Sequence, residues 1–208
     1  MIDISQNSLN QDLIETANAG DHPAEAALLL AQGADPKAQR SHALLRAAIK
    51  GHVETLKLLI PVSNTRGESS EALRMAARNG RSECVQLLIP WSNPKDMNSG
   101  ALGLAATHGH AECVNLLIPV STPLIENPQA LNLAMASGQA EIVSIMLRHE
   151  PSLLETIRHS GRLSLFRHTA VANGHADLAA LLSSLIDQDA LLSEIPLPDK
   201  SSSQPPRL

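Results

Sequence analysis

The chain has 208 residues, a formal net charge of −5 at pH 7, and 43% hydrophobic but only 1% aromatic residues. This length suits one domain with a core of aliphatic side chains. The negative charge and the lack of aromatic stacking platforms argue against nucleic acid as a partner. No apolar run is long enough to predict a membrane-spanning helix, so we expect no membrane partner.

The chain begins with a polar segment, residues 1–8, that we expect to be flexible. This segment has neither the basic nor the apolar region of a classical signal peptide. Residues 9–40 form the first predicted helix pair, with Gly20 at its turn. The distance in sequence from the turn glycine to the leucine run is one residue longer here than in the following pairs. We therefore expect an extra residue within 21–24.

A repeat of 29 residues organises the middle of the chain. Its marker is a turn glycine, which recurs at Gly51, Gly80, Gly109 and Gly138. An alanine-rich helix precedes each glycine, and glycine can end a helix in the left-handed conformation. A second apolar helix follows, with a glutamate in its first turn, and in most units a proline ends it. Such pairs bury their apolar faces only by stacking, so the sequence predicts a solenoid.

The predicted units then follow in order, with one irregularity near the end. The regular units are residues 41–69, 70–98, 99–127 and 128–149. The period fails after Leu147, and the helical spacing of apolar residues in the insertion 150–164 predicts an added turn or short helix. Residues 165–192 return to the pattern and cap the stack. The Pro- and Ser-rich residues 193–208 are predicted to be a disordered tail.

The repeated pattern Leu-x-x-Ala-Ala-x-x-Gly-His-x-Glu-x-Val-x-Leu-Leu-Ile resembles the ankyrin repeat. Residues 28–35, LLLAQGAD, resemble the end of an ankyrin unit, and the resemblance extends over roughly residues 9–185. It implies an all-α, ankyrin-like solenoid of about six helix–turn–helix units. The units are shorter than the common ankyrin length of ~33 residues, so we expect short loops in place of β-hairpins. Such short units are most similar to ankyrin arrays of bacterial proteins.

The sequence predicts no catalytic residues, no cofactor and no metal. It contains no nucleophile–base arrangement, phosphate-binding loop or set of four metal ligands. His108 and His110 form the most suggestive pair, but two histidines without further ligands make a poor metal site. The resemblance gives His52, His110 and His175 a structural role, in which each hydrogen-bonds the turn between helices.

Two cysteines, Cys84 and Cys113, occupy the same slot in adjacent units. Neighbouring packed helices lie about 10 Å apart, which is beyond the reach of a disulfide. We therefore predict buried, reduced cysteines, which fit a cytoplasmic protein.

Basic residues concentrate in one part of this acidic chain. Residues 36–95 carry ten basic and four acidic side chains. In ankyrin arrays, the two positions after the Ala-Ala pair face the concave groove, and the resemblance therefore places several variable residues there. These groove candidates are Ile49, Lys50, Arg78, Asn79, Thr107 and His108, with Arg46 and Arg74 nearby. They favour an electropositive surface for an acidic protein segment, although a solvated charged face would have the same composition.

Two further residues stand out from the repeat. Trp91 is the only tryptophan, and tryptophan is frequent at binding hot spots. Val62 and Val120 occupy the same slot, however, which favours an apolar loop anchor between units. Arg46 stands where the other units have apolar residues, which hints at a function for this side chain.

The sequence as a whole predicts a monomeric, non-catalytic module that binds a protein partner along its concave groove and loops. One alternative is a secreted bacterial effector that binds or blocks a host protein. Another is a self-assembling structural solenoid, because solenoid ends can stack. An enzyme remains possible only through a site that leaves no motif.

Overall fold

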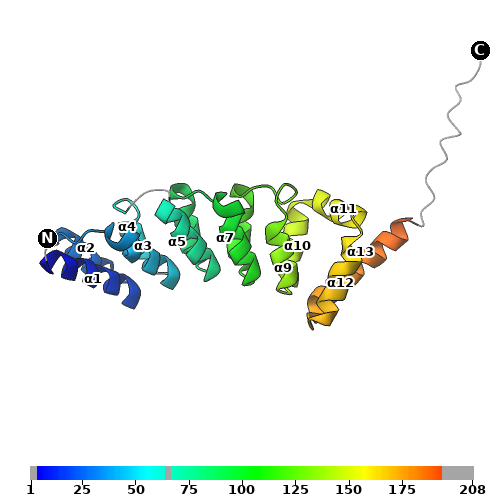
Figure 1. The fold of residues 1–208 in the computed structure, drawn as a ribbon, viewed down its shortest axis with the longest axis horizontal. Helices are drawn as coiled ribbons and strands as arrows, with labels where there is room; N and C mark the ends of the chain where they lie inside the picture. Colours follow the sequence, from blue (N-terminus) through cyan, green and yellow to red (C-terminus); the bar gives the residue numbers. More distant parts are fainter. Residues whose placement is uncertain (1–3, 64–66, 194–208) are drawn as a thin grey trace, which may run out of the picture.

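The structure is a computed structural model that describes residues 4–63 and 67–193, and these form a solenoid of helix pairs (Figure 1). The first helices of the units are α1 (Ile4–Ala19), α3 (Ala38–Lys50), α5 (Gly67–Arg78), α7 (Asp96–Thr107), α9 (Gln129–Ala136) and α12 (Arg162–Ala172). The second helices are α2 (Pro23–Ala31), α4 (Val53–Leu59), α6 (Ser82–Leu88), α8 (Ala111–Leu117), α10 (Ala140–His149) and α13 (Ala176–Ser193). The described residues contain no β-strand, so the predicted all-α solenoid is confirmed.

The units stack along the long axis of the molecule, with α1 and α13 at opposite ends (Figure 1). Each first helix from α1 to α9 contacts the first helix of the next unit. The contact surfaces are built from pairs such as Ala76-Ala77 and Ala105-Ala106, which are fully buried. Their small side chains let neighbouring helices approach closely. Both helices of a unit supply the larger core residues, such as Leu73 in α5 and Leu88 in α6. The core is therefore continuous along the solenoid, as expected for stacked repeats.

Short loops connect the units. After α6 and α8 the chain continues as single 3-10 turns, η1 (Ile89–Trp91) and η2 (Ile118–Val120), with a proline in the middle of each. The proline thus ends the α-helix, but the chain continues for one 3-10 turn. Beyond the turn, the backbone N–H of Asn93 donates to the Ser70 hydroxyl at 3.0 Å, and Thr122 does the same to Ser99. These buried serines tie each loop to the start of its own first helix.

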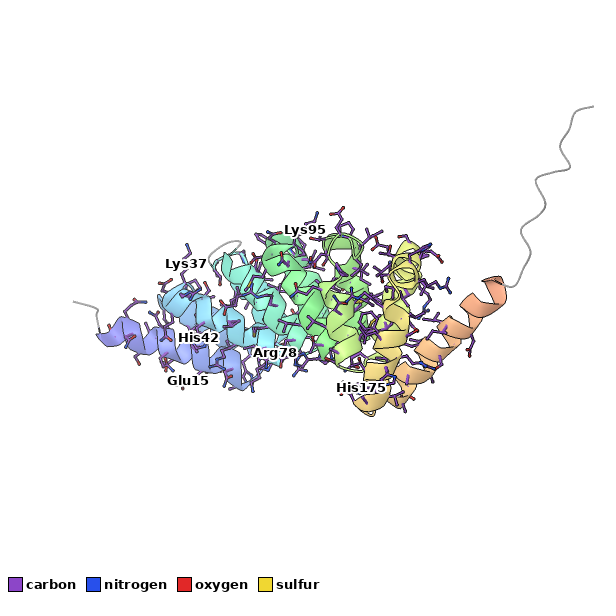
Figure 2. All side chains as sticks on the ribbon, turned by 45° about the vertical axis from the view of Figure 1, so that its right-hand side comes forward. Glu15, Lys37, His42, Arg78, Lys95 and His175 are labelled. Carbon is purple, nitrogen blue, oxygen red and sulfur yellow. The ribbon has the colours of Figure 1, made fainter. Side chains whose placement is uncertain are left out.

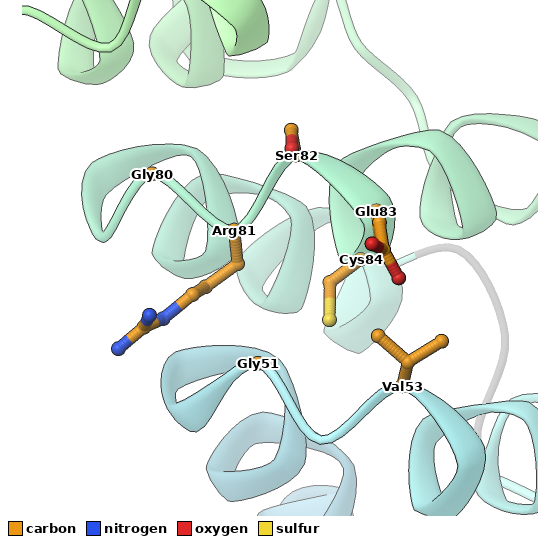
Figure 3. A pocket seen from close by; sticks show the side chains of 7 residues that line it. All are labelled: Gly51, Val53, Gly80, Arg81, Ser82, Glu83 and Cys84. Carbon is orange, nitrogen blue, oxygen red and sulfur yellow. The ribbon is translucent and has the colours of Figure 1, made fainter.

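A series of contacts that we call the turn ladder joins the turns of successive units. The residue after a turn glycine donates its side-chain hydrogen bond to a carbonyl near the end of the first helix of the preceding unit. The four bonds are His52 to Ala17 at 3.0 Å, Arg81 to Ile49 at 3.2 Å, His110 to Arg78 at 3.0 Å and Gln139 to Thr107 at 3.3 Å. Figure 3 shows the Arg81 side chain reaching the turn at Gly51. His52 and His110 therefore bond the end of the preceding unit's first helix, and not the turn between helices that the sequence analysis expected.

The two ends of the array differ from the sequence expectations. Helix α1 begins at Ile4, so residues 4–8, which the sequence predicted to be flexible, are helical, and the Gln6 side chain donates to the Gly33 carbonyl at 2.7 Å. The insertion contains helix α11 (Pro151–His159), a short helix as predicted, which buries Leu153 and Ile157. The last unit begins at Arg162, three residues before the expected start, because α12 follows α11 after a turn at Gly161. The predicted tail lies outside the described residues from 194 onward.

Helix α4 is capped by a residue of the preceding unit, Asp21. Its carboxylate accepts the backbone N–H groups of Glu54 and Thr55 and the Thr55 hydroxyl, at 2.8–3.1 Å. Asp21 lies in the segment that has the extra residue, so the irregular turn of the first unit places this cap. Burial raises the pKa of Asp21, but these hydrogen bonds and nearby His52 outweigh burial and hold the pKa below its ordinary value of 3.8.

We expect Asp21→Ala to destabilise the protein by about 1 kcal/mol at pH 7, because two backbone donors of α4 lose their acceptor. A carboxylate whose pKa is lower in the folded state stabilises fully above its unfolded value and less as the pH falls through the folded value. The difference between the wild type and Asp21→Ala should therefore shrink below about pH 4. Urea unfolding at pH 7 and pH 3 measures it, and an unchanged difference at pH 3 would contradict the charged cap.

Candidate binding surface

The solvent-facing side of α3, α5, α7 and α9 forms one continuous surface, which we call the first-helix face. Its residues recur at helical spacings of three and four, so they share one side of each helix. They are His42, Leu45, Arg46, Ile49 and Lys50; Glu71, Arg74, Met75 and Arg78; Gly100, Gly103, Leu104, Thr107 and His108; and Gln129, Asn132, Leu133 and Ala136. In Figure 2, Lys95 lies at the edge where the first helices begin, and Arg78 lies toward the edge where they end.

Most residues predicted for the groove lie on this face or at its edge. The side chains of Lys50, Arg78 and His108 are exposed, whereas Ile49 and Thr107 are half-buried. Asn79 is exposed but donates its amide to the Met75 carbonyl within its own helix at 2.7 Å.

Two of these side chains also bond within α7. The Thr107 hydroxyl donates to the Gly103 carbonyl at 2.8 Å, and His108 donates to the Leu104 carbonyl at 2.9 Å. The His108 ring stacks on His110, with centroids 6.2 Å apart. Both histidines therefore have roles in the fold, and the described residues contain no group of three or more potential ligands that could hold a metal ion.

Arg46 and Arg74 are the two half-buried cations of the face. Arg46 donates from Nε to His42 Nε2 at 3.0 Å, which fixes its direction along α3. Burial, followed by the charge of Arg46, lowers the pKa of His42 from its ordinary value of 6.5. His42 is therefore a neutral acceptor at pH 7. Arg74 forms an ion pair with Asp96 at 3.4 Å, which holds its guanidinium between α5 and α7.

The first-helix face carries an excess of positive charge. Four cations, Arg46, Lys50, Arg74 and Arg78, share it with the single acidic residue Glu71. Glu71 itself faces Arg40 at 3.8 Å. Within the described part of the chain, Lys50 and Arg78 form no ion pair, so their charges face solvent.

Trp91 lies apart from this face, in η1 at the end of a second helix. Trp91 is 46% exposed, and Val62, in the same slot of the preceding unit, is 41% exposed. Val120, in the same slot of the following unit, is partly buried and packs against the core, so the interpretation of this slot as a loop anchor between units stays a prediction for Trp91. The repeated position is a partly exposed apolar corner of the loop.

The structure shows a hollow on the first-helix face that the sequence analysis did not identify. It has a volume of about 320 Å³ and lies where α5, α7 and α9 meet. Gly100 and Gly103 line it, together with Arg74, Leu104, Thr107 and Leu133 among others. We call it the glycine hollow, and it is the place where the structure brings Arg74 and Thr107 together.

The glycine hollow exists because of two substitutions within the repeat. The slot of Gly100 holds Glu71 or Gln129 in the neighbouring units, and the slot of Gly103 holds Arg74 or Asn132. Neither Gly100 nor Gly103 has a positive φ, so the backbone does not require glycine at these positions. Glycine inside a helix costs about 1 kcal/mol relative to alanine. The sequence does show that Gly100-Ala101-Leu102-Gly103 stands where the preceding unit has Glu71-Ala72-Leu73-Arg74. Whether the missing side chains leave a hollow depends on the side chains of the neighbouring units.

A smaller hollow between units two and three, shown in Figure 3, belongs to the turn ladder. It has a volume of about 200 Å³ and is lined by Arg81, Glu83 and Cys84 among others. Cys84 and Cys113 are free and buried, and burial raises the pKa of each thiol to about 11. Both are therefore protonated at pH 7, and neither is an activated nucleophile.

A comparison with protein-family models matches residues 13–100 and 102–191 to ankyrin repeats (3 copies). The chain belongs to the ankyrin repeat family. Ankyrin repeats are generally protein–protein interaction modules and are typically non-catalytic. A search of curated proteins finds no match. Every ankyrin helix in the described residues falls short, in length or in apolar character, of what a membrane span requires.

Proposed function

We propose that this ankyrin array is a non-catalytic module that binds an acidic segment of a protein partner along its first-helix face. The observation that carries the proposal is the pair of exposed cations on adjacent units, Lys50 and Arg78, which form no ion pair among the described residues. They lie on a face with a single acidic residue. Complementary charge would speed association and orient the partner.

The other candidate residues have supporting roles in this proposal. Ile49 and Thr107 offer apolar contact surface between the charged positions, and His108 and Asn79 border the turns. Arg46 and Arg74 are held in place by His42 and Asp96 and add to the positive field. Trp91 would contact only a partner that extends over the loops. The protein would act as a monomer in the cytoplasm, where its free cysteines stay reduced.

The double substitution Lys50→Glu/Arg78→Glu is expected to abolish capture of the partner from cell lysate. It reverses two charges on the binding face, and we expect the affinity to fall at least about tenfold, because like charges would then oppose each other across the interface. The matched control is Lys57→Glu/Arg148→Glu, which makes the same change in net charge on exposed residues of the second helices α4 and α10. Circular dichroism confirms that both variants are folded.

The proposal predicts a partner that is captured by the wild type and the control, lost from Lys50→Glu/Arg78→Glu, and released by raising the salt concentration. A partner that the face variant retains would place the binding site elsewhere. Recovery of no partner from any lysate would argue against a binding module. Light scattering on the same wild-type sample tests the monomer, and a mass that grows with concentration would favour self-assembly.

A further inference from the structure

We propose that the glycine hollow receives one bulky apolar side chain, phenylalanine or leucine, from the acidic segment of the protein partner. The inference rests on the proposed function and assigns the position at which the partner is anchored. The wall residues suit such a guest, because Leu104 and Leu133 face the space from two neighbouring units and Ala130 lies beside them. The helix pairs of the neighbouring units form with larger residues in the slots of Gly100 and Gly103, so the fold itself does not require the hollow.

The dimensions of the hollow fit an aromatic ring. A cavity of about 150 Å³ can hold a benzene molecule, and the glycine hollow is about twice that volume. It opens to solvent, so part of the space is left for the backbone that carries the side chain. Met97 stands at its rim and is 67% exposed, and a flexible thioether of this kind adapts to guests of different shape.

Charge at the rim indicates which residues flank the guest. Arg74 lines the hollow, its side chain is 19% exposed, and its one hydrogen bond within the described residues goes from Nη1 to Asp96. A guanidinium has five N–H donors, so donors remain for a carboxylate of the partner. Arg78 lies one turn further along the same face of α5. An apolar side chain between acidic residues therefore complements the hollow and its surroundings.

The test uses an array of acidic peptides, Asp-Glu-X-Glu-Asp, in which X is each amino acid in turn. The wild type is expected to prefer phenylalanine and leucine over alanine at X by about tenfold or more, because burying a large apolar side chain is worth about that much. The filled variant Gly100→Gln/Gly103→Leu carries side chains that occur in the same slots of other units, Gln129 and Leu45. It should bind all peptides equally, with binding that still depends on salt.

A second filled variant, Gly103→Ala, is used in case the first variant does not fold. A Cβ at this position would lie 3.1 Å from a terminal methyl of Leu133, which is half-buried and able to rotate. Gly103→Ala should melt close to the wild-type temperature, because removing a glycine from a helix interior offsets the tight contact with Leu133. Gly100 directly follows three residues with positive φ, at the start of the regular part of α7, so circular dichroism confirms that Gly100→Gln/Gly103→Leu is folded. A wild type without preference at X, or a folded filled variant that keeps the preference, would overturn the proposal.

The peptide array separates this proposal from the proposed function. Lys50→Glu/Arg78→Glu should lose binding to every peptide, whereas the filled variant should lose only the preference at X. If the wild type binds no peptide, the acidic partner is wrong, and the hollow is then tested alone with benzyl alcohol. Methyl signals of Leu104 and Leu133 should shift at millimolar concentrations, those of exposed Leu28 should not, and the shifts should vanish in the filled variant. If these shifts are absent, the hollow does not receive an apolar group and the proposal is overturned. Micromolar binding of benzyl alcohol would also overturn it, because it would indicate a site for a small molecule.

Discussion

Leu88→Ala is expected to destabilise the protein by about 3 kcal/mol. Leu88 is 0% exposed, near the end of α6 in the middle of the solenoid. Its slot is filled by Leu59 and Leu117 in the adjacent units, and both are equally buried. Removing a large aliphatic side chain from such a site costs about 2–5 kcal/mol, because the neighbours close the cavity only in part.

The measurement is urea unfolding followed by circular dichroism and by the fluorescence of Trp91, the only tryptophan. A midpoint shared by the two signals shows that the array unfolds as one unit. The melting temperature should fall by roughly 6–12 °C, from about 2–4 °C per kcal/mol for a chain of this size. Leu28→Ala is the control, because Leu28 is 57% exposed and should change stability by less than about 1 kcal/mol. Equal losses in the two variants would contradict the continuous core.

Gly80→Ala is expected to cost about 3 kcal/mol, because two penalties combine at this turn. Gly80 has a φ of +66°, a left-handed conformation that costs a residue with a Cβ about 1–2 kcal/mol. A Cβ at Gly80 would also lie 2.6 Å from Nδ1 of the His110 ring. The ring would have to move, which breaks its 3.0 Å hydrogen bond to the Arg78 carbonyl and adds about 1–1.5 kcal/mol.

The chain provides a matched control for this substitution in its last unit. Gly174 has a φ of +76°, but no other atom lies within 4 Å of the position of an added Cβ. Gly174→Ala should therefore cost only the backbone strain. A second test repeats Gly80→Ala in a His110→Ala background, where the steric clash is absent and the extra penalty should disappear. If Gly80→Ala and Gly174→Ala cost the same, the turn ladder does not stabilise the stack.

The features predicted correctly are those encoded within single units. Gly51, Gly80, Gly109 and Gly138 all have positive φ values, and each ends a first helix as the sequence indicated. The apolar stripe of each second helix is buried, and α11 formed where Leu153 and Ile157 had helical spacing. These are short-range properties, because a helix and its turn depend on residues within a few positions of one another.

Contacts between residues that lie far apart in the chain were not predicted from the sequence. Residues 4–8 appeared loose from their polar composition, yet Gln6 reaches the turn of α2 at Gly33. Asp21 caps a helix that lies more than thirty residues away along the chain. The exposure of Trp91, 46%, also depends on how its loop packs and could not be read from the sequence.

The sequence by itself determined the repeat, the helix pairs, the family and the basic side chains of residues 36–95. The tertiary structure alone decided which of those cations stay unpaired, which carbonyl each ladder residue bonds, and that Gly100 and Gly103 open a hollow. The physical reason is that periodicity and turn chemistry are local, whereas an empty volume is defined by every side chain around it. Arg74, Leu104 and Leu133 come from three different units, and only stacking brings them to the same space.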